Sequence, residues 1–245
     1  MRTAGVDLAA ADERTALAVI EWSPGRAVLR DLRLGVSDAD IVAAVPTCAK
    51  TGIDCALGWP EPFIRLLVAH RAGHAADLPS PGGGAAWRRA MVYRTTDEVI
   101  RADFGLIPLS VSADRLAHAA MRCAAILATL AAAGVDVDRS GAGAIVEAYP
   151  AVALRRWDLT HRGYKGRHDP LVDALRARAW LDLGGHEPLM RASHDAFDAV
   201  IAALTARAAA LGRATRPGPA QLAPARVEGW IAVPTADLDE LPEAS

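Results

Sequence analysis

Three apolar segments at residues 3–9, 15–22 and 27–34 constrain the fold of this chain more than any other feature of its sequence. The links between them, residues 11–14 and the triplet Ser23-Pro24-Gly25, have the length and composition of hairpin turns. The third segment alternates apolar and charged residues, which is typical of a strand with one buried face. The chain is therefore predicted to begin with three antiparallel strands.

Farther along the chain, helix patterns are interleaved with single strands. Short apolar runs at residues 53–57 and 144–148 predict a fourth and a fifth strand. Helices are predicted at residues 38–50 with a kink near Pro46, and at 61–71, 95–101, 112–133, 151–157, 169–183 and 193–211. This order indicates an α/β fold with a mixed central sheet flanked by helices.

The length of 245 residues suits one large domain. We expect that domain at residues 1–234, with a loop and helical insertion at about 73–135 and an acidic flexible tail at 235–245. The PSPGGG sequence predicts a mobile loop at residues 73–90. Residues 213–226 have the composition of a linker, and GWIAV at 229–233 is predicted as an edge strand.

Composition excludes several classes of protein. The formal net charge of −2 provides no general attraction for nucleic acid. The N-terminal sequence lacks the apolar core of a signal peptide, and the longest apolar stretch is interrupted by His118 and Arg122, so no membrane span is expected. Cys48, Cys55 and Cys123 suit neither a disulfide framework nor a zinc site, which favours a cytoplasmic location.

Carboxylates stand where buried strands would ordinarily carry apolar residues. Asp7, Asp54 and Glu147 lie in or at the end of the first, fourth and fifth predicted strands, and Asp195 and Asp198 lie three apart on the last long helix. Buried carboxylates are costly unless they are paired or bound to a cation. Because clustered oxygens favour Mg²⁺ or Mn²⁺ over zinc, we expect these five side chains to form a site for one of those ions.

Each acid also has an ordinary structural explanation. A strand-end Asp often caps a turn, and Asp195 follows the predicted N-cap Ser193, where an acid complements the helix dipole. Asp198 lies one turn farther into the helix, so this explanation is weaker there. The combination of acids at several strand ends favours the metal site.

Three further residues are candidates for catalysis or substrate binding. Lys165, in the Gly-flanked GYKGR segment, is one of two lysines and suits a scissile phosphate or the neutralisation of the acids; otherwise it is a solvated loop lysine. Arg94 and Asp97 in YRTTDEVIR are candidates for the same cleft, with Arg94 binding a phosphate. The alternative is an Arg–Asp pair that fixes the start of a helix.

The segments GVDLA, IDCALGWP, YRTTDEVIR, VEAYPA with the later YKG, and SHDAFDAVIAALTA resemble a family of uncharacterised proteins that are predicted nucleases with an RNase H-like fold. The resemblance extends over residues 3–233. The last of these segments also resembles the final acidic helix of Holliday-junction resolvases, in which two helix Asp residues join a strand-one Asp and a strand-four acid around Mg²⁺. By position these correspond to Asp7, Asp54, Asp195 and Asp198, whereas Glu147 belongs to the pattern of the predicted nucleases alone.

The resemblance implies metal-dependent hydrolysis of phosphodiester bonds, with Asp7, Asp54, Glu147, Asp198 and Lys165 at the centre of the chemistry. The expected substrate is a nucleic acid or a nucleotide. Two alternatives remain open: a phosphotransferase or nucleotide hydrolase of the same superfold, and a non-catalytic module that binds a metal. The phosphotransferase would need glycine-rich phosphate-binding turns, and GVDLAAADERT has only Gly5 before its first Asp. The oligomeric state is left open.

Overall fold

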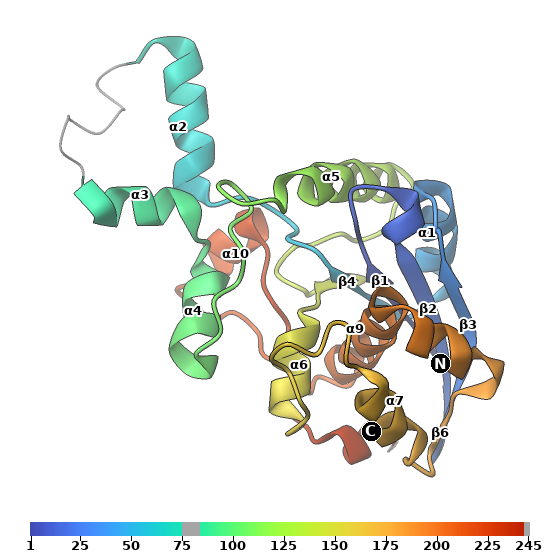
Figure 1. Ribbon diagram of the computed structural model, residues 1–245. Coiled ribbons are helices and arrows are strands. Elements are labelled where there is room, and N and C mark those ends of the chain that lie inside the picture. Colours follow the sequence, from blue (N-terminus) through green and yellow to red (C-terminus); the bar gives the residue numbers. More distant parts are fainter. Residues whose placement is uncertain (75–83, 243–245) are drawn as a thin grey trace.

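The computed structural model describes residues 1–74 and 84–242 as a six-stranded mixed sheet with helices on both faces (Figure 1). The strands are β1 Arg2–Asp7, β2 Ala16–Ser23, β3 Arg26–Leu34, β4 Lys50–Asp54, β5 Ile145–Glu147 and β6 Leu181–Asp182. The helices are α1 Asp38–Ala44, α2 Glu61–Ala72, α3 Gly84–Val92, α4 Thr95–Phe104, α5 Ala117–Ala132, α6 Pro150–Arg156, α7 Asp169–Arg176, α8 Glu187–Ala192, α9 His194–Ala210 and α10 Leu222–Glu228. The predicted α/β class and mixed sheet are confirmed.

Strand β1 lies in the interior of the sheet, whose order is β5-β4-β1-β2-β3-β6. The predicted meander is present, because β2 is antiparallel to both β1 and β3. On its other side β1 is parallel to β4, and β4 is parallel to β5. The carboxyl ends of these three parallel strands therefore meet at one edge of the sheet.

Successive side chains of β1 point to opposite faces of the sheet, each of which is covered by helices. Ala4 and Val6 face the layer that contains α5 and Ile41 of α1. Gly5, two residues before Asp7, faces α9, and a Cβ at Gly5 would lie only 2.1 Å from the carbonyl oxygen of Ala199. Since side chains alternate with a period of two, Asp7 points to the same face as Gly5.

Strand β4 repeats this arrangement. A Cβ at Gly52 would lie 2.4 Å from the carbonyl oxygen of Ala202, so α9 also packs directly on the backbone of this strand. Asp54, two residues later, shares the face of Gly52. The two glycines thus let α9 approach the sheet closely, and each is followed by an Asp on the helix-covered face.

Several predicted boundaries were wrong, each for a local reason. The first helix ends at Ala44 because a 3₁₀ turn containing Pro46 follows it, and β4 then ends at Asp54, earlier than predicted. Helix α5 begins at Ala117 and not at residue 112, because the Ser112 hydroxyl donates to the Met91 carbonyl (2.7 Å) and caps no helix.

The loop and the linker predicted from composition contain helices. Helix α3 occupies most of the second half of the loop predicted at 73–90, whereas residues 75–83 of that loop lie outside the described residues. Helix α10 lies at the end of the predicted linker. Helix α7 ends at Arg176 and short strand β6 follows, where one helix was expected over 169–183. The GWIAV segment is not an edge strand: it makes an isolated bridge, between Ile231 and Glu147.

The described part of the C-terminal segment, residues 235–242, packs against the body of the protein, in contrast to the expected flexible tail. Leu238 and Leu241 are buried, and the Trp157 indole donates to the carbonyl of Ala236 (3.3 Å). Arg207 Nε donates to the carbonyl of Leu241 at 3.0 Å. Among the described residues, no helix is long and apolar enough to cross a membrane.

Helices α2 and α3 extend away from the sheet, α4 lies below α3 in this view, and α10 packs against α2 and α4 (Figure 1). The segment that joins α4 to α5 returns toward the carboxyl ends of β4 and β5. This return brings residues of the region predicted as an insertion to the same edge of the sheet as the predicted acids.

Candidate acidic site at the carboxyl edge of the sheet

Asp7 and Asp54 are direct neighbours at the ends of two parallel strands. They are register partners between β1 and β4, and adjacent strands lie roughly 4.8 Å apart. Both residues are half-buried. Among the described residues, neither carboxylate forms a hydrogen bond or an ion pair, which distinguishes them from the other predicted acids of the site.

The protein raises the pKa of both carboxyl groups. Burial is the largest cause at Asp7, followed by the negative charges of Asp54 and Asp198. Burial, then the charge of Asp198, raises the pKa of Asp54 from its ordinary 3.8 to about 7. Nearby Lys165 acts in the opposite direction on both groups without restoring their ordinary pKa values. The charged forms are therefore incompletely compensated by the protein itself.

Asp198 completes a group of three acids from the helix side. It lies in α9 with a fully buried side chain, because α9 packs against the carboxyl-terminal halves of β1 and β4. Its Oδ1 accepts a hydrogen bond from the Tyr164 hydroxyl at 2.7 Å, and its Oδ2 lies 2.8 Å from Lys165 Nζ. Burial nevertheless raises the pKa of Asp198, with Lys165 and Tyr164 opposing the effect.

The loop that carries Lys165 is shaped by two glycines and one tyrosine. Gly163 and Gly166 have φ angles of 63° and 91°, a conformation that favours glycine. Between them, Tyr164 is buried and packs edge-on against Phe197 of α9, with ring centroids 6.2 Å apart. The Lys165 side chain is half exposed, and Asp198 and Asp54 raise its pKa despite its partial desolvation. It therefore stays an ammonium ion beside the acids.

Asp195 is engaged elsewhere. Arg14 Nε and Nη2 donate to its two carboxylate oxygens at 2.7 and 3.1 Å, and His194 Nε2 lies 3.0 Å from Oδ1. Burial opposes ionisation of Asp195, but the Arg14 hydrogen bond outweighs it and the pKa is lowered. The predicted N-cap is present, because Ser193 Oγ accepts from the Ala196 amide at 3.2 Å. The sequence predicts Asp195 as a metal ligand or as a residue that complements the helix dipole. Its two carboxylate oxygens accept hydrogen bonds from Arg14.

Glu147 points away from the acid group. It is the register partner of Ile53, one residue before Asp54, so strand alternation directs the two acidic side chains to opposite faces. Both Glu147 oxygens accept from Arg94, each at 2.7 Å, and Oε2 also accepts from the Leu57 amide at 3.1 Å. Burial outweighs Arg94 and raises the pKa of Glu147.

Arg94 uses all five of its N–H groups within the protein. Besides Glu147, it donates to both oxygens of Asp97, at 2.8 and 3.1 Å, and to the Glu228 carbonyl at 3.1 Å. Asp97 also accepts from the Arg94 amide at 2.9 Å, at the start of α4. Arg94 has no N–H left for a phosphate, so the geometry matches the structural alternative: a buried link between α4, β5 and the end of α10.

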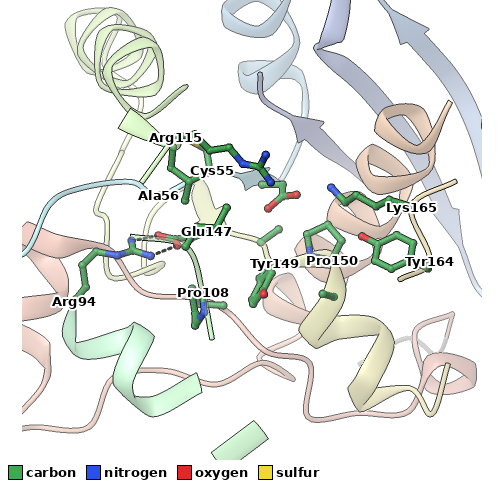
Figure 2. Close-up of a pocket in the computed structure, with 16 residues that line it drawn as sticks. Cys55, Ala56, Arg94, Pro108, Arg115, Glu147, Tyr149, Pro150, Tyr164 and Lys165 are labelled. Atoms are coloured by element: carbon green, nitrogen blue, oxygen red, sulfur yellow. Dashed lines mark hydrogen bonds and ion pairs between the residues drawn. The ribbon is translucent and has the colours of Figure 1, made fainter. Parts of the chain in front are cut away.

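A cavity of about 320 Å³ opens beside Asp54. Its lining includes Lys165 and Tyr164 on one side and Arg115, Pro108 and Leu109 from the α4–α5 segment on the other. Figure 2 shows Arg115 and Lys165 pointing toward each other across the cavity, with Tyr149 and Pro108 at a distance from both cations.

Three residues that were not predicted also lie at the site: Arg14, Arg115 and Tyr149. Nothing in their local sequence marks them, because their place at the site depends on contacts between distant segments. Tyr164 stands out in the sequence only as part of the YKG segment, and the glycines on either side indicate that this loop has a special conformation.

The carboxylates of Asp7, Asp54 and Asp198 are ligands suited to a hard divalent cation, but in this structure they are not arranged closely enough to bind one. Among residues 1–74 and 84–242, no group of three or more His, Cys, Asp or Glu side chains is close enough to hold a metal ion. In this conformation Lys165 is the cation at Asp198. Asp7 and Asp54 offer free carboxylate oxygens, the ligand type that Mg²⁺ prefers, and Asp198 offers two more if Lys165 moves aside.

The fold and site define a mixed α/β protein with an acidic centre at the carboxyl edge of its sheet. Comparison with protein families shows that the chain belongs to the family described as "Protein of unknown function (DUF429)", whose model matches residues 5–222. The match spans Asp7, Asp54, Asp97, Glu147, Asp195 and Asp198. No curated protein and no solved structure matches the chain.

Proposed function

We propose that the protein is a Mg²⁺- or Mn²⁺-dependent hydrolase of phosphodiester bonds with an RNase H-like fold. The observation that carries this proposal is the pair Asp7 and Asp54: adjacent, half-buried carboxylates with raised pKa values and no partner among the described residues. A structural Asp at such a place is ordinarily paired or hydrogen-bonded. Unpaired acids in a cleft favour a functional role.

The positions of the acids support the likeness to resolvases. The first strand is internal and parallel to the fourth, each ends in an Asp, and the late acidic helix covers both ends. Asp198 is the helix residue that faces them, as its effects on both pKa values indicate. The proposed ligands are therefore Asp7, Asp54 and Asp198. Glu147 and Asp195 are left out because their oxygens bind Arg94 and Arg14.

The chain's own residues would divide the remaining tasks. A bound divalent ion supplies Lewis-acid stabilisation and a lowered pKa for water. Tyr164 fixes one oxygen of Asp198 by its hydrogen bond and so limits the orientations of that carboxylate. Lys165, permanently charged and half exposed, is placed to neutralise Asp198 before substrate arrives and to contact a phosphate oxygen afterwards. Arg14 holds Asp195 and compensates its negative charge.

The test is metal-dependent cleavage of RNA, single-stranded DNA, duplexes, branched junctions and dinucleotides by wild type and by single variants. Asp7→Asn and Asp198→Asn should each lower the rate by several orders of magnitude. Asp195→Asn should cost less, because Asp195 is not a proposed ligand. Asp103→Asn is the matched control, since Asp103 is exposed and its side chain forms no hydrogen bond or ion pair with the described residues.

Two outcomes would contradict the proposal. Cleavage that is equal in wild type and Asp7→Asn would identify a contaminating nuclease. Tight Mn²⁺ binding that requires Asp7, without cleavage of any substrate, would favour the non-catalytic metal-binding module. No observation on the structure favours the phosphotransferase: the turn after β1 continues into a 3₁₀ segment at Asp12–Arg14 whose Arg14 binds Asp195.

A further inference from the structure

The cavity beside Asp54 contains a cation that has no partner among the described residues. Three cationic residues are among its described lining residues. Arg94 donates all of its N–H groups within the protein, and Lys165 is paired with Asp198. Arg115 forms no ion pair or hydrogen bond within the described part of the chain, although Figure 2 shows it extended over the cavity toward Lys165. A guanidinium in this position can donate two parallel hydrogen bonds to one phosphate group.

The rest of the lining suits a small organic group. Pro108, Leu109, Leu116, Pro150 and Ile231 provide apolar surface, and Tyr149 provides an aromatic ring. Leu109 is 42% exposed, so its side chain is available to a ligand. The volume of about 320 Å³ lies at the lower end of the range of roughly 300–1,000 Å³ for small-molecule sites.

We propose that this cavity binds a single nucleotide unit, with the phosphate between Arg115 and Lys165 and the nucleoside against Leu109, Pro108 and Tyr149. The inference rests on the proposed function, because a phosphate can lie beside the Asp54 carboxylate only when the proposed divalent ion lies between these two anions. It specifies the substrate class further: an unpaired nucleotide is accepted, whether free or at the end of a single strand, and a fully paired duplex is excluded by the size of the cavity.

The test measures binding and not turnover. A nucleoside 5′-monophosphate has no diester bond to cleave, so its affinity for the full chain is measured by calorimetry in Mn²⁺. Arg115→Ala should weaken binding about tenfold, the value of one charge-assisted contact. Leu109→Trp should weaken it by at least as much, because the indole fills the apolar part of the cavity. Arg101→Ala is the control, because Arg101 of α4 is exposed, lies outside the cavity, and its side chain forms no hydrogen bond or ion pair with the described residues.

Further ligands distinguish a free nucleotide from a nucleotide at the end of a single strand, and show which part of the nucleotide is bound. A bare nucleoside and inorganic phosphate should each bind more weakly than the monophosphate. A single-stranded oligonucleotide with an unpaired terminal nucleotide should be sensitive to both variants, and a blunt duplex should bind poorly. Duplex binding as tight as single-strand binding, or monophosphate binding unchanged in Leu109→Trp and Arg115→Ala, would overturn the inference.

Failure of this inference is distinguishable from failure of the proposed function. Cleavage that needs Asp7 but is indifferent to Arg115→Ala and Leu109→Trp would leave the hydrolase proposal in place and refute the cavity as its substrate site. Monophosphate binding that both variants abolish, without cleavage of any substrate, would support the cavity and refute the hydrolase. Circular dichroism and the melting temperature of each variant show whether a lost signal reflects unfolding.

Discussion

Replacing Asp54 by Asn should stabilise the protein at pH 8 in the absence of divalent metal. The side chain of Asp54 accepts no hydrogen bond within the described residues, so the substitution removes a charge without breaking a contact. Burial, then the charge of Asp198, raises the pKa of Asp54 from 3.8 to about 7. The folded protein thus holds this proton more tightly than the unfolded chain does, and stability must fall as the pH rises between those two values.

The size of the effect follows from the two pKa values. Their difference of about 3 corresponds to about 4 kcal/mol at 1.36 kcal/mol per unit. This is an upper limit, because Asp7 titrates together with Asp54 and shares the same repulsion. The stabilisation by Asp54→Asn should therefore amount to about 1–4 kcal/mol above pH 7 and should disappear near pH 4, where the carboxyl group is protonated in both states.

Urea unfolding of wild type and Asp54→Asn in a chelator, at several values between pH 4 and pH 9, measures this difference directly. Asp103→Asn serves as the control for loss of an exposed charge. An Asp54→Asn variant that is less stable than wild type at pH 8 would refute the argument, because Asp54 would then have a favourable partner. So would a stability difference that does not depend on pH.

Three further predictions concern the surroundings of Asp54. Millimolar Mg²⁺ or Mn²⁺ should raise the melting temperature, and Asp7→Asn should remove most of that rise; an equal rise in both proteins would place the ion elsewhere. Gly52→Val should destabilise the protein by more than about 3 kcal/mol in urea unfolding, since a Cβ at Gly52 would lie 2.4 Å from the Ala202 carbonyl oxygen. Gly185→Ala should be nearly neutral, because a Cβ at Gly185 would have no atom within 4 Å. Arg94→Met should cost about 3–5 kcal/mol by the same assay, because it leaves the buried Asp97 and Glu147 without a counter-charge, and a loss below 1 kcal/mol would contradict the structural role of this link.

The sheet and the strand-end acids could be predicted from the sequence because both depend on local patterns. The hairpin links and the alternation in the third segment marked β1 to β3, and an Asp inside an apolar run marked Asp7 and Asp54. Ser193 marked the start of α9. These signals lie in the same segments as the features they predict, so no knowledge of the tertiary structure was needed.

The division of the acids between two faces could not be predicted in the same way. Glu147 resembles Asp54 in the sequence, since each ends a short buried strand. Only the register of β5 against β4 shows that Glu147 is level with Ile53 and therefore points to the other face. The partners of the acids, Arg94 for Glu147 and Arg14 for Asp195, lie 53 and 181 residues away in sequence.

Segments with mixed signals were also mispredicted. The glycine and proline content of residues 73–90 predicts a loop, although the helix-forming residues of α3 lie in its second half. The acidic residues of 235–242 predict a loose tail, although Leu238 and Leu241 are buried. In the C-terminal segment, Leu238 and Leu241 join a hydrophobic cluster formed by distant elements. Such tertiary contacts cannot be predicted from composition alone.

The close packing of α9 on the sheet connects the fold with the acidic site. Gly5 and Gly52 have no side chains, and α9 presents Ala199, Ala202 and Ala203 to them, so the helix backbone comes into contact with the backbone of β1 and β4. Larger residues at these places would lift the helix from the sheet. Asp198 would then move away from Asp7 and Asp54, and the shared repulsion that raises their pKa values would weaken. The small residues of this interface are therefore as necessary for the acidic centre as the carboxylates themselves, and a variant such as Gly5→Ala should lose metal-induced stabilisation even under conditions in which it still folds.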